Sequence, residues 1–229
     1  MRIIVSCPEC IGEKENSAIL ALGNENTYKV VCDKGHIQNI SLPHQRHEIL
    51  FEFGVYAIAD GYYREAISSF AAALERYYEY FLRVISTRSH STKYFDQIWK
   101  QVSSQSERQL GGYIFAHFLV YNQPPTLIDN PLIELRNKAI HKGYIPEKEE
   151  ALKFGAGVAN LVNSGVARLH EHFRDEVHEI TRQTLYPDST SGGNRVHIHQ
   201  TYLNSLTVQN RMELGEYAER IETHNRARY

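Results

Sequence analysis

Residues 62–85, YYREAISSFAAALERYYEYFLRVI, decide the fold class of this 229-residue chain. Apolar side chains recur in this stretch at steps of three and four residues, at Ile67, Phe70, Ala71, Leu74, Tyr78, Phe81, Leu82 and Ile85. On an α-helix this spacing forms one continuous apolar stripe. We therefore predict a long helix from Tyr62 to Ile85 that buries one face in a protein core.

The same periodicity predicts helices on both sides of this segment, over 43–59, 91–103, 106–121, 130–141 and 147–184. The helix at 130–141 has clear end signals, because Asn130-Pro131 suits its start and Gly143 suits its termination. The stripe of the last helix, from Leu152 to Ile180, suits either packing in its own bundle or a helix of a partner subunit. Together these helices predict a mainly α fold, an up-and-down helical bundle over residues 43–185.

The N-terminal segment predicts a small β module that binds a metal. Cys7 and Cys10 form a C-x2-C pair, and Cys32 with His36 forms a second pair. Two short strands are predicted between the pairs, at 17–22 and 27–32. Thiolates and an imidazole in two close pairs suit tetrahedral zinc, and four protein ligands would close its coordination sphere. We therefore predict a zinc ribbon over residues 1–42 that holds a structural Zn²⁺.

Two further observations bear on the ligands of this ribbon. All three cysteines lie in the first 32 residues of a chain whose N-terminus shows no secretory signal, which favours metal binding over disulfides. Gly35 supplies the tight turn that aims His36 at the ion. His44 or His47 is the alternative fourth ligand.

Beyond the bundle, residues 186–198 are rich in turn formers, and a charged helix is predicted at 209–228. His197 and His199 alternate as they would in a surface strand. The sparse apolar stripe of the last helix suits an arm that packs on another subunit or on the ribbon, or a segment that is partly disordered. The predicted organisation is therefore a zinc ribbon at 1–42, a helical bundle at 43–185, and a linker with a C-terminal helical arm at 186–229.

Composition limits the functional classes. The hydrophobic share of 42% and the charged share of 23% are those of a soluble globular protein, and no stretch approaches the roughly 20 apolar residues that span a bilayer. We expect a cytoplasmic protein without a membrane partner. Because the formal net charge is only −2, any nucleic acid must be held by a local basic patch.

The segment LRNKAIHKGY, residues 135–144, carries the candidate catalytic motif. Arg136 and His141 form an R-x4-H pair, with Asn137 directly after the arginine, on a short capped helix between two long amphipathic ones. This pattern resembles the HEPN superfamily, whose R-x4-6-H motif often carries a polar residue after the arginine. The long helix that contains ADGYYREAISSFAAALERYYEYFLR is also similar to the early long helix of such domains. The resemblance covers residues 43–185.

The resemblance implies a metal-independent endoribonuclease, with RNA as substrate and a site generally assembled at the interface of a homodimer. Proteins of this family commonly act as toxins or in antiviral defence, so a regulatory or neutralising protein is expected as a further partner. His141 would be the general base or acid, Arg136 would stabilise the phosphate, and Asn137 would orient the histidine or the phosphate. No catalytic metal is needed, because RNA carries its own nucleophile in the 2′-hydroxyl group.

Neighbouring side chains extend the predicted site. Lys138 and Lys142 would hold flanking phosphates. Tyr144 would stack on a base or bind phosphate, or would instead pack under the loop. Glu75 and Glu79 are candidates to pair with Arg136 across the bundle, although both also suit an ordinary solvated surface.

Helical geometry constrains this motif. Residues five apart on an ideal helix diverge by about 140°, so Arg136 and His141 point to different faces. A working site needs His141 at the helix end, an Arg136 side chain that bends round the helix, or a second subunit that donates its copy. We predict the homodimeric arrangement. The alternative function is a non-catalytic nucleic-acid-binding or regulatory adaptor, and a third is a structural subunit of a larger assembly.

Overall fold

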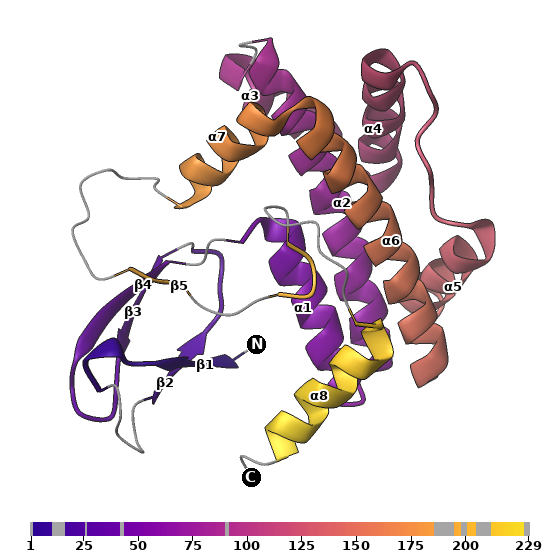
Figure 1. The fold of residues 1–229 in the computed structure, drawn as a ribbon. Helices are drawn as coiled ribbons and strands as arrows, with labels where there is room; N and C mark the ends of the chain where they lie inside the picture. The colour runs from indigo at the N-terminus through magenta and orange to yellow at the C-terminus, as the bar shows by residue number, and fades with distance from the viewer. Residues whose placement is uncertain are drawn as a thin grey trace. The chain divides into compact units, whose positions relative to one another are not determined.

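The computed structural model describes residues 2–10, 17–25, 27–41, 44–89, 92–185, 195–197, 201–204 and 212–226 (Figure 1). The chain is mainly helical with a small N-terminal β region, as the sequence predicts. It divides into two compact units. The N-terminal unit contains Met1–His44 and Thr181–Gln200, and the helical unit contains Gln45–Ile180 and Thr201–Tyr229.

Two small sheets form the N-terminal unit. Strands β1 (Arg2–Ser6) and β2 (Ser17–Ala21) pair antiparallel, with Ile4 opposite Ile19. Strands β3 (Thr27–Val31) and β4 (Ile37–Ser41) pair antiparallel in the second sheet. The predicted strands at 17–22 and 27–32 are thus confirmed as β2 and β3. Residues along β3 alternate between buried and exposed, as expected for a strand with one face against a core.

Strand β5 (Arg195–His197) completes the second sheet by pairing parallel to β4. It lies at the end of the segment 186–198, which the sequence predicted as rich in turn formers, and it includes His197, for which a surface strand was predicted. A three-residue strand carries too few residues for a period to show, so its pairing with β4 defines it. The strand predicted around His197 is present, whereas His199 lies outside the described residues.

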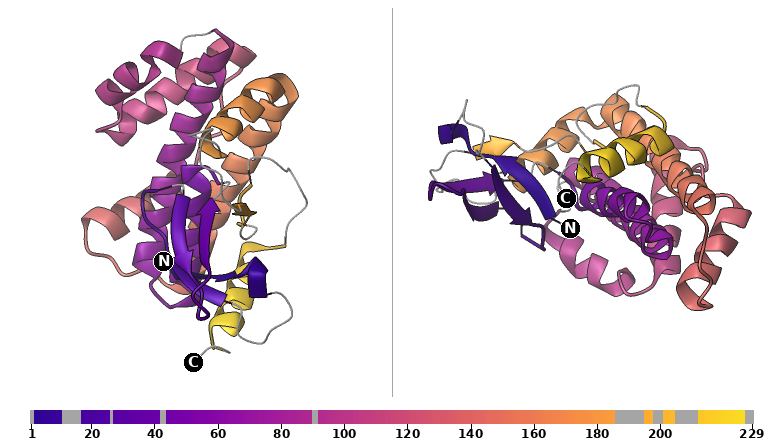
Figure 2. Two further views of the ribbon diagram at one scale, coloured as in Figure 1. Left: turned by 90° about the vertical axis from the view of Figure 1, so that its left-hand side faces the viewer. Right: turned by 90° about the horizontal axis from the view of Figure 1, so that it is seen from below.

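Eight α-helices are described, and several of them pack on one long helix (Figure 2). They are α1 (Arg46–Ala59), α2 (Tyr63–Arg88), α3 (Thr92–Val102), α4 (Ser106–Tyr121), α5 (Asn130–His141), α6 (Lys148–His172), α7 (Arg174–Leu185) and α8 (Leu214–Arg226). Helix α2 contacts α1, α3, α4, α5 and α6, and is the central helix of its unit. The predicted stripe at 62–85 therefore lies on a helix that is buried over much of its circumference.

Helix α1 begins three residues later than predicted from Pro43, which lies outside the described residues. Gln45 is the N-cap, and its side chain accepts from the backbone N–H of Glu48 while its own backbone N–H donates to the Glu48 carboxylate at 2.7 Å. This reciprocal capping box satisfies two amides that would otherwise lack partners. The predicted end at Asp60-Gly61 is confirmed, because Gly61 adopts a left-handed φ of 81°.

The single helix predicted at 147–184 is wrong, because α6 ends at His172 and α7 begins at Arg174. Phe173 separates them, with a φ of −138° and a buried ring. The guanidinium of Arg88 lies 3.8 Å from the centre of this ring, donates to the His172 carbonyl, and pairs with Glu176 at 2.7 Å. The break is thus stabilised by a side chain from α2. The periodicity of residues 147–184 contains no information about this distant contact. The stripe itself packs inside its own bundle.

Helix α8 of the C-terminal arm packs on its own bundle, and not on another subunit or on the ribbon as the sequence predicted. Leu214, Ala218 and Ile221 of α8 are buried in the core cluster, and α8 contacts α1 and α6. The Tyr217 hydroxyl donates to the buried Glu52 carboxylate at 2.8 Å, and the Tyr202 amide donates to its other oxygen at 3.0 Å. A carboxylate in α1 therefore holds two parts of the arm.

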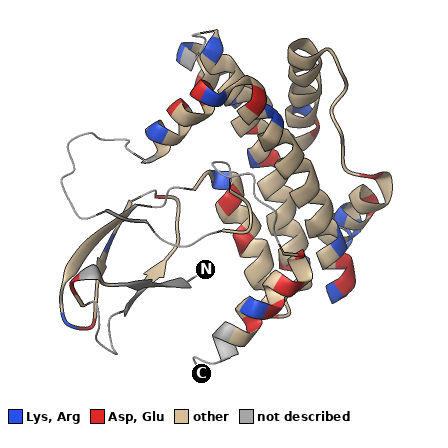
Figure 3. Ribbon diagram, viewed as in Figure 1, with Lys and Arg blue, Asp and Glu red and all other residues tan. Residues whose placement is uncertain are grey.

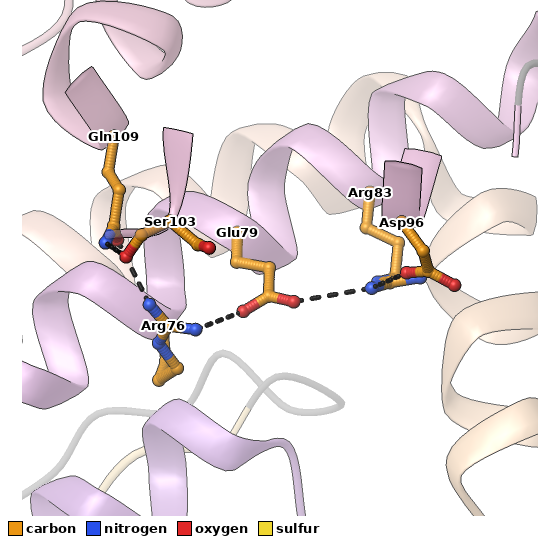
Figure 4. Close-up of polar contacts among 6 residues, drawn as sticks. All are labelled: Arg76, Glu79, Arg83, Asp96, Ser103 and Gln109. Atoms are coloured by element: carbon orange, nitrogen blue, oxygen red, sulfur yellow. Dashed lines mark hydrogen bonds and ion pairs between the residues drawn. The ribbon is translucent and has the colours of Figure 1, made fainter. Parts of the chain in front are cut away.

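Helices α2, α3 and α4 are joined by a chain of charged and polar groups (Figure 4). Glu79 accepts from Arg76 at 2.6 Å and from Arg83 at 3.3 Å. Arg83 extends the chain to Asp96 of α3, and Arg76 extends it to Gln109 of α4. Both carboxylate oxygens of Glu79 are thus engaged within this network.

The helical unit contains a buried histidine that should make its stability depend on pH. The ring of His47 packs against Tyr80 with a centroid distance of 5.0 Å and against Tyr77 with one of 5.8 Å. Burial lowers the pKa of His47 to about 4, although the neighbouring Glu48 opposes the shift. The unfolded chain, with a histidine pKa near 6.5, therefore binds this proton over a range in which the folded chain does not.

We expect the free energy of unfolding to fall by about 3 kcal/mol through this group as pH falls from 6.5 to 4, with no contribution above 6.5. His47→Gln should remove that part of the slope, whereas His178→Gln on an exposed face should retain it. Urea unfolding at a series of pH values measures the difference. Equal slopes for the wild type and His47→Gln would contradict the assignment.

Candidate functional site

The N-terminal unit brings together the four predicted metal ligands. The ligand atoms of Cys7, Cys10, Cys32 and His36 all lie within 4.8 Å of one another. From His36 Nδ1, the distances to the three sulfurs are 3.2 Å for Cys10, 3.6 Å for Cys32 and 3.8 Å for Cys7. A tetrahedral zinc site with Zn–S near 2.3 Å and Zn–N near 2.0 Å separates sulfur and nitrogen by about 3.5 Å. The group can therefore hold a metal ion.

Local backbone geometry explains how the second pair of ligands forms. Gly35 has a left-handed φ of 85°, and its N–H donates to the Cys32 carbonyl at 2.8 Å. The Cys32 N–H in turn donates to the His36 carbonyl at 3.1 Å. The turn folds His36 back beside Cys32, as the glycine predicted. His36 joins the three cysteines, whereas His47 lies among the aromatic rings of the helical unit.

The surroundings of the sulfurs differ from one ligand to the next. Burial and the two neighbouring thiols raise the pKa of Cys10 to about 11. Burial also opposes ionisation of Cys32, but backbone amides of Lys34 and His36 donate to its sulfur and the pKa is lowered to about 7. Gln38, which the sequence did not single out, is buried and donates to Cys7 Sγ at 3.7 Å. It lies on β4 two residues after His36, opposite Val30 of β3, and no motif in the sequence marks it.

The second candidate site lies on α5, where the structure brings Arg136, Asn137 and His141 together within one chain. Arg136 Nη1 donates to Asn137 Oδ1 at 2.9 Å and lies 3.5 Å from His141 Nε2. The arginine side chain bends round the helix to reach the histidine at its last residue. The divergence expected on an ideal helix is thereby overcome within one chain, and the predicted homodimer stays a prediction. Since guanidinium nitrogens only donate, the contact requires an unprotonated Nε2 on His141.

Glu75 is the acidic partner of this motif. Its Oε1 lies 3.5 Å from Arg136 Nη2, and both side chains are about one quarter exposed. Glu79, the other candidate, is taken by Arg76 and Arg83. Burial raises the pKa of Glu75, while Arg136 and Arg76 act in the opposite direction. Of the two candidate partners of Arg136, Glu75 is therefore the one that pairs with it, because Glu79 belongs to the α2–α3–α4 network.

Arg136 and Asn137 also line a cavity of about 340 Å³ in the helical unit. Glu75 lies in the same wall, together with Glu107. Most of the lining is apolar and comes from α2, α4, α5, α6 and the segment before α5: Ala71, Leu74, Tyr78, Leu110, Leu127, Ile128, Ile133 and Phe154. The volume lies at the lower end of the range for small-molecule sites, about 300–1,000 Å³. His141 is exposed and does not line it.

The remaining predicted residues are not brought into that cavity. Lys138 and Tyr144 line a separate polar depression, where the Tyr144 hydroxyl donates to Glu150 at 2.9 Å. Lys142 is exposed and directly follows His141. Arg64 of α2, which the sequence did not single out, donates to the Ala139 carbonyl at 3.0 Å and adds a cation near this end of α5. Figure 3 marks the Lys and Arg positions of α5 in blue on the ribbon.

No family model, curated protein or solved structure matches this chain. The resemblance to the HEPN superfamily thus stays a prediction that depends on the motif and its helical surroundings. Among the described helices, none combines the length and the apolar character that are needed to cross a membrane.

The Cys7, Cys10, Cys32 and His36 cluster should bind one metal ion per chain. We expect added Co²⁺ to give the absorption of a tetrahedral thiolate site, because three sulfurs and one nitrogen surround the ion. His36→Ala should weaken binding strongly, whereas His44→Ala, the matched control, should not. Full Co²⁺ affinity in both His36→Ala and Cys32→Ser would exclude the site.

Proposed function

We propose that this chain is a metal-independent endoribonuclease of the HEPN type that cuts RNA at Arg136, Asn137 and His141. One observation supports this most directly: Arg136 Nη1 lies within reach of both Asn137 and His141 in a single chain. A fixed cation beside a histidine is the minimum that cleavage by the 2′-hydroxyl group requires. A role as a toxin or in antiviral defence would follow from the resemblance alone.

In the proposed reaction the 2′-oxygen attacks the adjacent phosphorus and the 5′-oxygen leaves. When Arg136 turns from His141 Nε2 to the phosphate, this nitrogen is free to accept the proton of the 2′-hydroxyl group, and the leaving oxygen takes a proton from water or from the imidazolium. Arg136 stabilises the negative charge that develops on the phosphate oxygens. Asn137 positions the guanidinium through its amide oxygen. The products are a 2′,3′-cyclic phosphate and a 5′-hydroxyl group.

The electrostatics of α5 support RNA as the substrate class. Lys142 directly follows His141, and Arg64 reaches the same end of the helix. These cations suit flanking phosphates in a protein whose net charge is slightly negative. Lys138 and Tyr144, in their separate depression, would contact more distant parts of the substrate.

We further propose that the metal of the N-terminal unit is Zn²⁺ in a structural role. Three thiolates and an imidazole are the ligand set of closed zinc sites. The unit is small, and metal binding would contribute much of its folding energy. It would serve to recognise RNA or a protein partner.

Cleavage should be lost when either partner of the motif is removed. In buffer with EDTA, we expect His141→Ala to slow the cutting of total RNA by about 10²–10⁴-fold, and Arg136→Ala by about 10²–10³-fold. His178→Ala and Arg174→Ala, on exposed positions of α7, are the matched controls and should cut at the wild-type rate. Gel analysis and end-group mapping of the products measure the effect.

The folded state of each preparation should be checked by circular dichroism, because EDTA also removes the ion of the N-terminal unit. Cutting that persists equally in both motif variants would contradict the nuclease. RNA binding without cutting in the wild type would instead support the adaptor function.

The homodimer remains part of the proposal, and exposed apolar side chains on α4 support it. Phe115 is 71% exposed, Leu119 is 77% exposed and Phe118 is 49% exposed. Residues 110–121 carry no Asp, Glu, Lys or Arg, and the site of Gly111 opens into free space. Two copies of such a face can pack closely about a two-fold axis without burying a charge.

Leu119→Glu should shift the protein from a dimer to its 26.4 kDa monomer in sedimentation equilibrium, because each interface would bury two unpaired carboxylates. Ile145→Glu, at a position 78% exposed outside α4, should leave the dimer intact. A wild-type protein that is monomeric at micromolar concentration would contradict this interface.

A further inference from the structure

The cavity beside Arg136 has the composition of a ligand site. Leu127 and Ile133 line it and are 42% and 39% exposed, so they form an apolar rim that solvent can reach. Tyr78 and Phe154 also line it, although they are only 5% and 2% exposed. A flat apolar ligand would cover these surfaces, and nucleobases bind proteins between such side chains.

Polar groups in the cavity wall belong to the proposed cleavage site or contact it. Arg136 has one terminal nitrogen beside Glu75 and the other beside Asn137 and His141. Glu75 lines the cavity, whereas His141 does not. The guanidinium therefore lies between the cavity and His141. If Arg136 binds the scissile phosphate, the base of a neighbouring nucleotide can enter the cavity.

The hydrogen-bonding groups of the wall select among the bases. Glu75 supplies two acceptor oxygens, and Asn137, whose amide oxygen accepts from Arg136, can donate from its amide nitrogen. Guanine offers two adjacent donors, N1–H and N2–H, next to the acceptor O6. Adenine N1 and cytosine N3 are acceptors and cannot donate to Glu75. Uracil has one donor, N3–H, which lies between the acceptors O2 and O4. Guanine alone satisfies both oxygens of the carboxylate.

We propose that this cavity binds a guanine base of the RNA substrate, with Glu75 accepting from N1–H and N2–H and Asn137 donating to O6. The inference rests on the proposed function, since it takes RNA as the substrate of the same site. It adds base specificity to a motif that by itself contacts only phosphate and ribose.

Binding can be tested separately from cutting with RNA that cannot be cut. The full-length protein is titrated with fluorescein-labelled oligocytidylates that are 2′-O-methylated throughout and carry one central guanine, inosine, adenine or uracil. We expect the guanine oligomer to bind about 10- to 100-fold more tightly than the adenine oligomer, with inosine intermediate because it lacks the 2-amino group.

Two variants assign the preference to the cavity. Glu75→Gln keeps the shape of the side chain but loses an acceptor, and should reduce the preference for guanine to within about threefold. Ile133→Trp should do the same by filling the cavity from its exposed rim. Glu79→Gln, one turn along α2 and outside the cavity, is the matched control and should retain the preference. Thermal unfolding identifies any variant that fails to fold.

The outcomes distinguish this inference from the proposed nuclease. Equal binding of all four oligomers by the wild type overturns the guanine site, even if the protein cuts RNA through Arg136 and His141. A guanine preference that is lost in Glu75→Gln and Ile133→Trp supports the site, even if no cutting is found. A preference that survives in both folded variants overturns the assignment to this cavity.

Discussion

The helical unit depends on one close packing arrangement, in which the ring of Phe70 lies between glycines of two neighbouring helices. A methyl group on Gly155 of α6 would approach this ring and Leu214 to 2.7 Å, and one on Gly54 of α1 would overlap the ring as well. Only glycine, which has no side chain, allows α1 and α6 to pack this closely against α2 at the position of Phe70. Phe70 is fully buried, so the position of α2 is determined from two sides. The other helices that contact α2 pack against a helix held in this position. One of them is α5, which carries the candidate motif.

The distribution of acids along α2 then determines the environment of Arg136. Glu79 is saturated by Arg76 and Arg83, and these pairs bind α3 and α4 to the central helix. Glu75, one turn earlier, lies near Arg136 and is partly desolvated. A single carboxylate at 3.5 Å restrains the guanidinium without occupying all of its five donors. Arg136 can therefore keep its contact to Asn137, release His141 Nε2, and bind an anion. An arginine held by two short bidentate pairs would lack that capacity.

Periodicity and end signals predicted most of the helical elements, because local sequence decides them. The stripe of α2, the start of α5 at Asn130-Pro131 and the metal ligand spacing around Gly35 are of this kind. The elements that were missed depend on contacts between distant residues. Arg88 of α2 interrupts the helix at Phe173, Glu52 of α1 binds the C-terminal arm, and β4 pairs with a three-residue strand. The sequence likewise could not decide whether Glu75 or Glu79 pairs with Arg136. That depends on Arg76 and Arg83, which both pair with Glu79 in the folded structure.

The metal cluster and the candidate catalytic motif lie in different compact units, and this separates their chemistry. The N-terminal unit has a small apolar core, with Leu20, Tyr28, Val30 and Ile40 among its buried residues, so a bound ion would supply much of its order. The helical unit has an extensive core of its own. The candidate site belongs to this unit, with Arg136, Asn137, His141 and Glu75. RNA cleavage through the 2′-hydroxyl group needs proton transfer and charge stabilisation, which a histidine and an arginine supply. The N-terminal unit can therefore depend on a metal ion for its folding, while the proposed reaction in the helical unit proceeds without one.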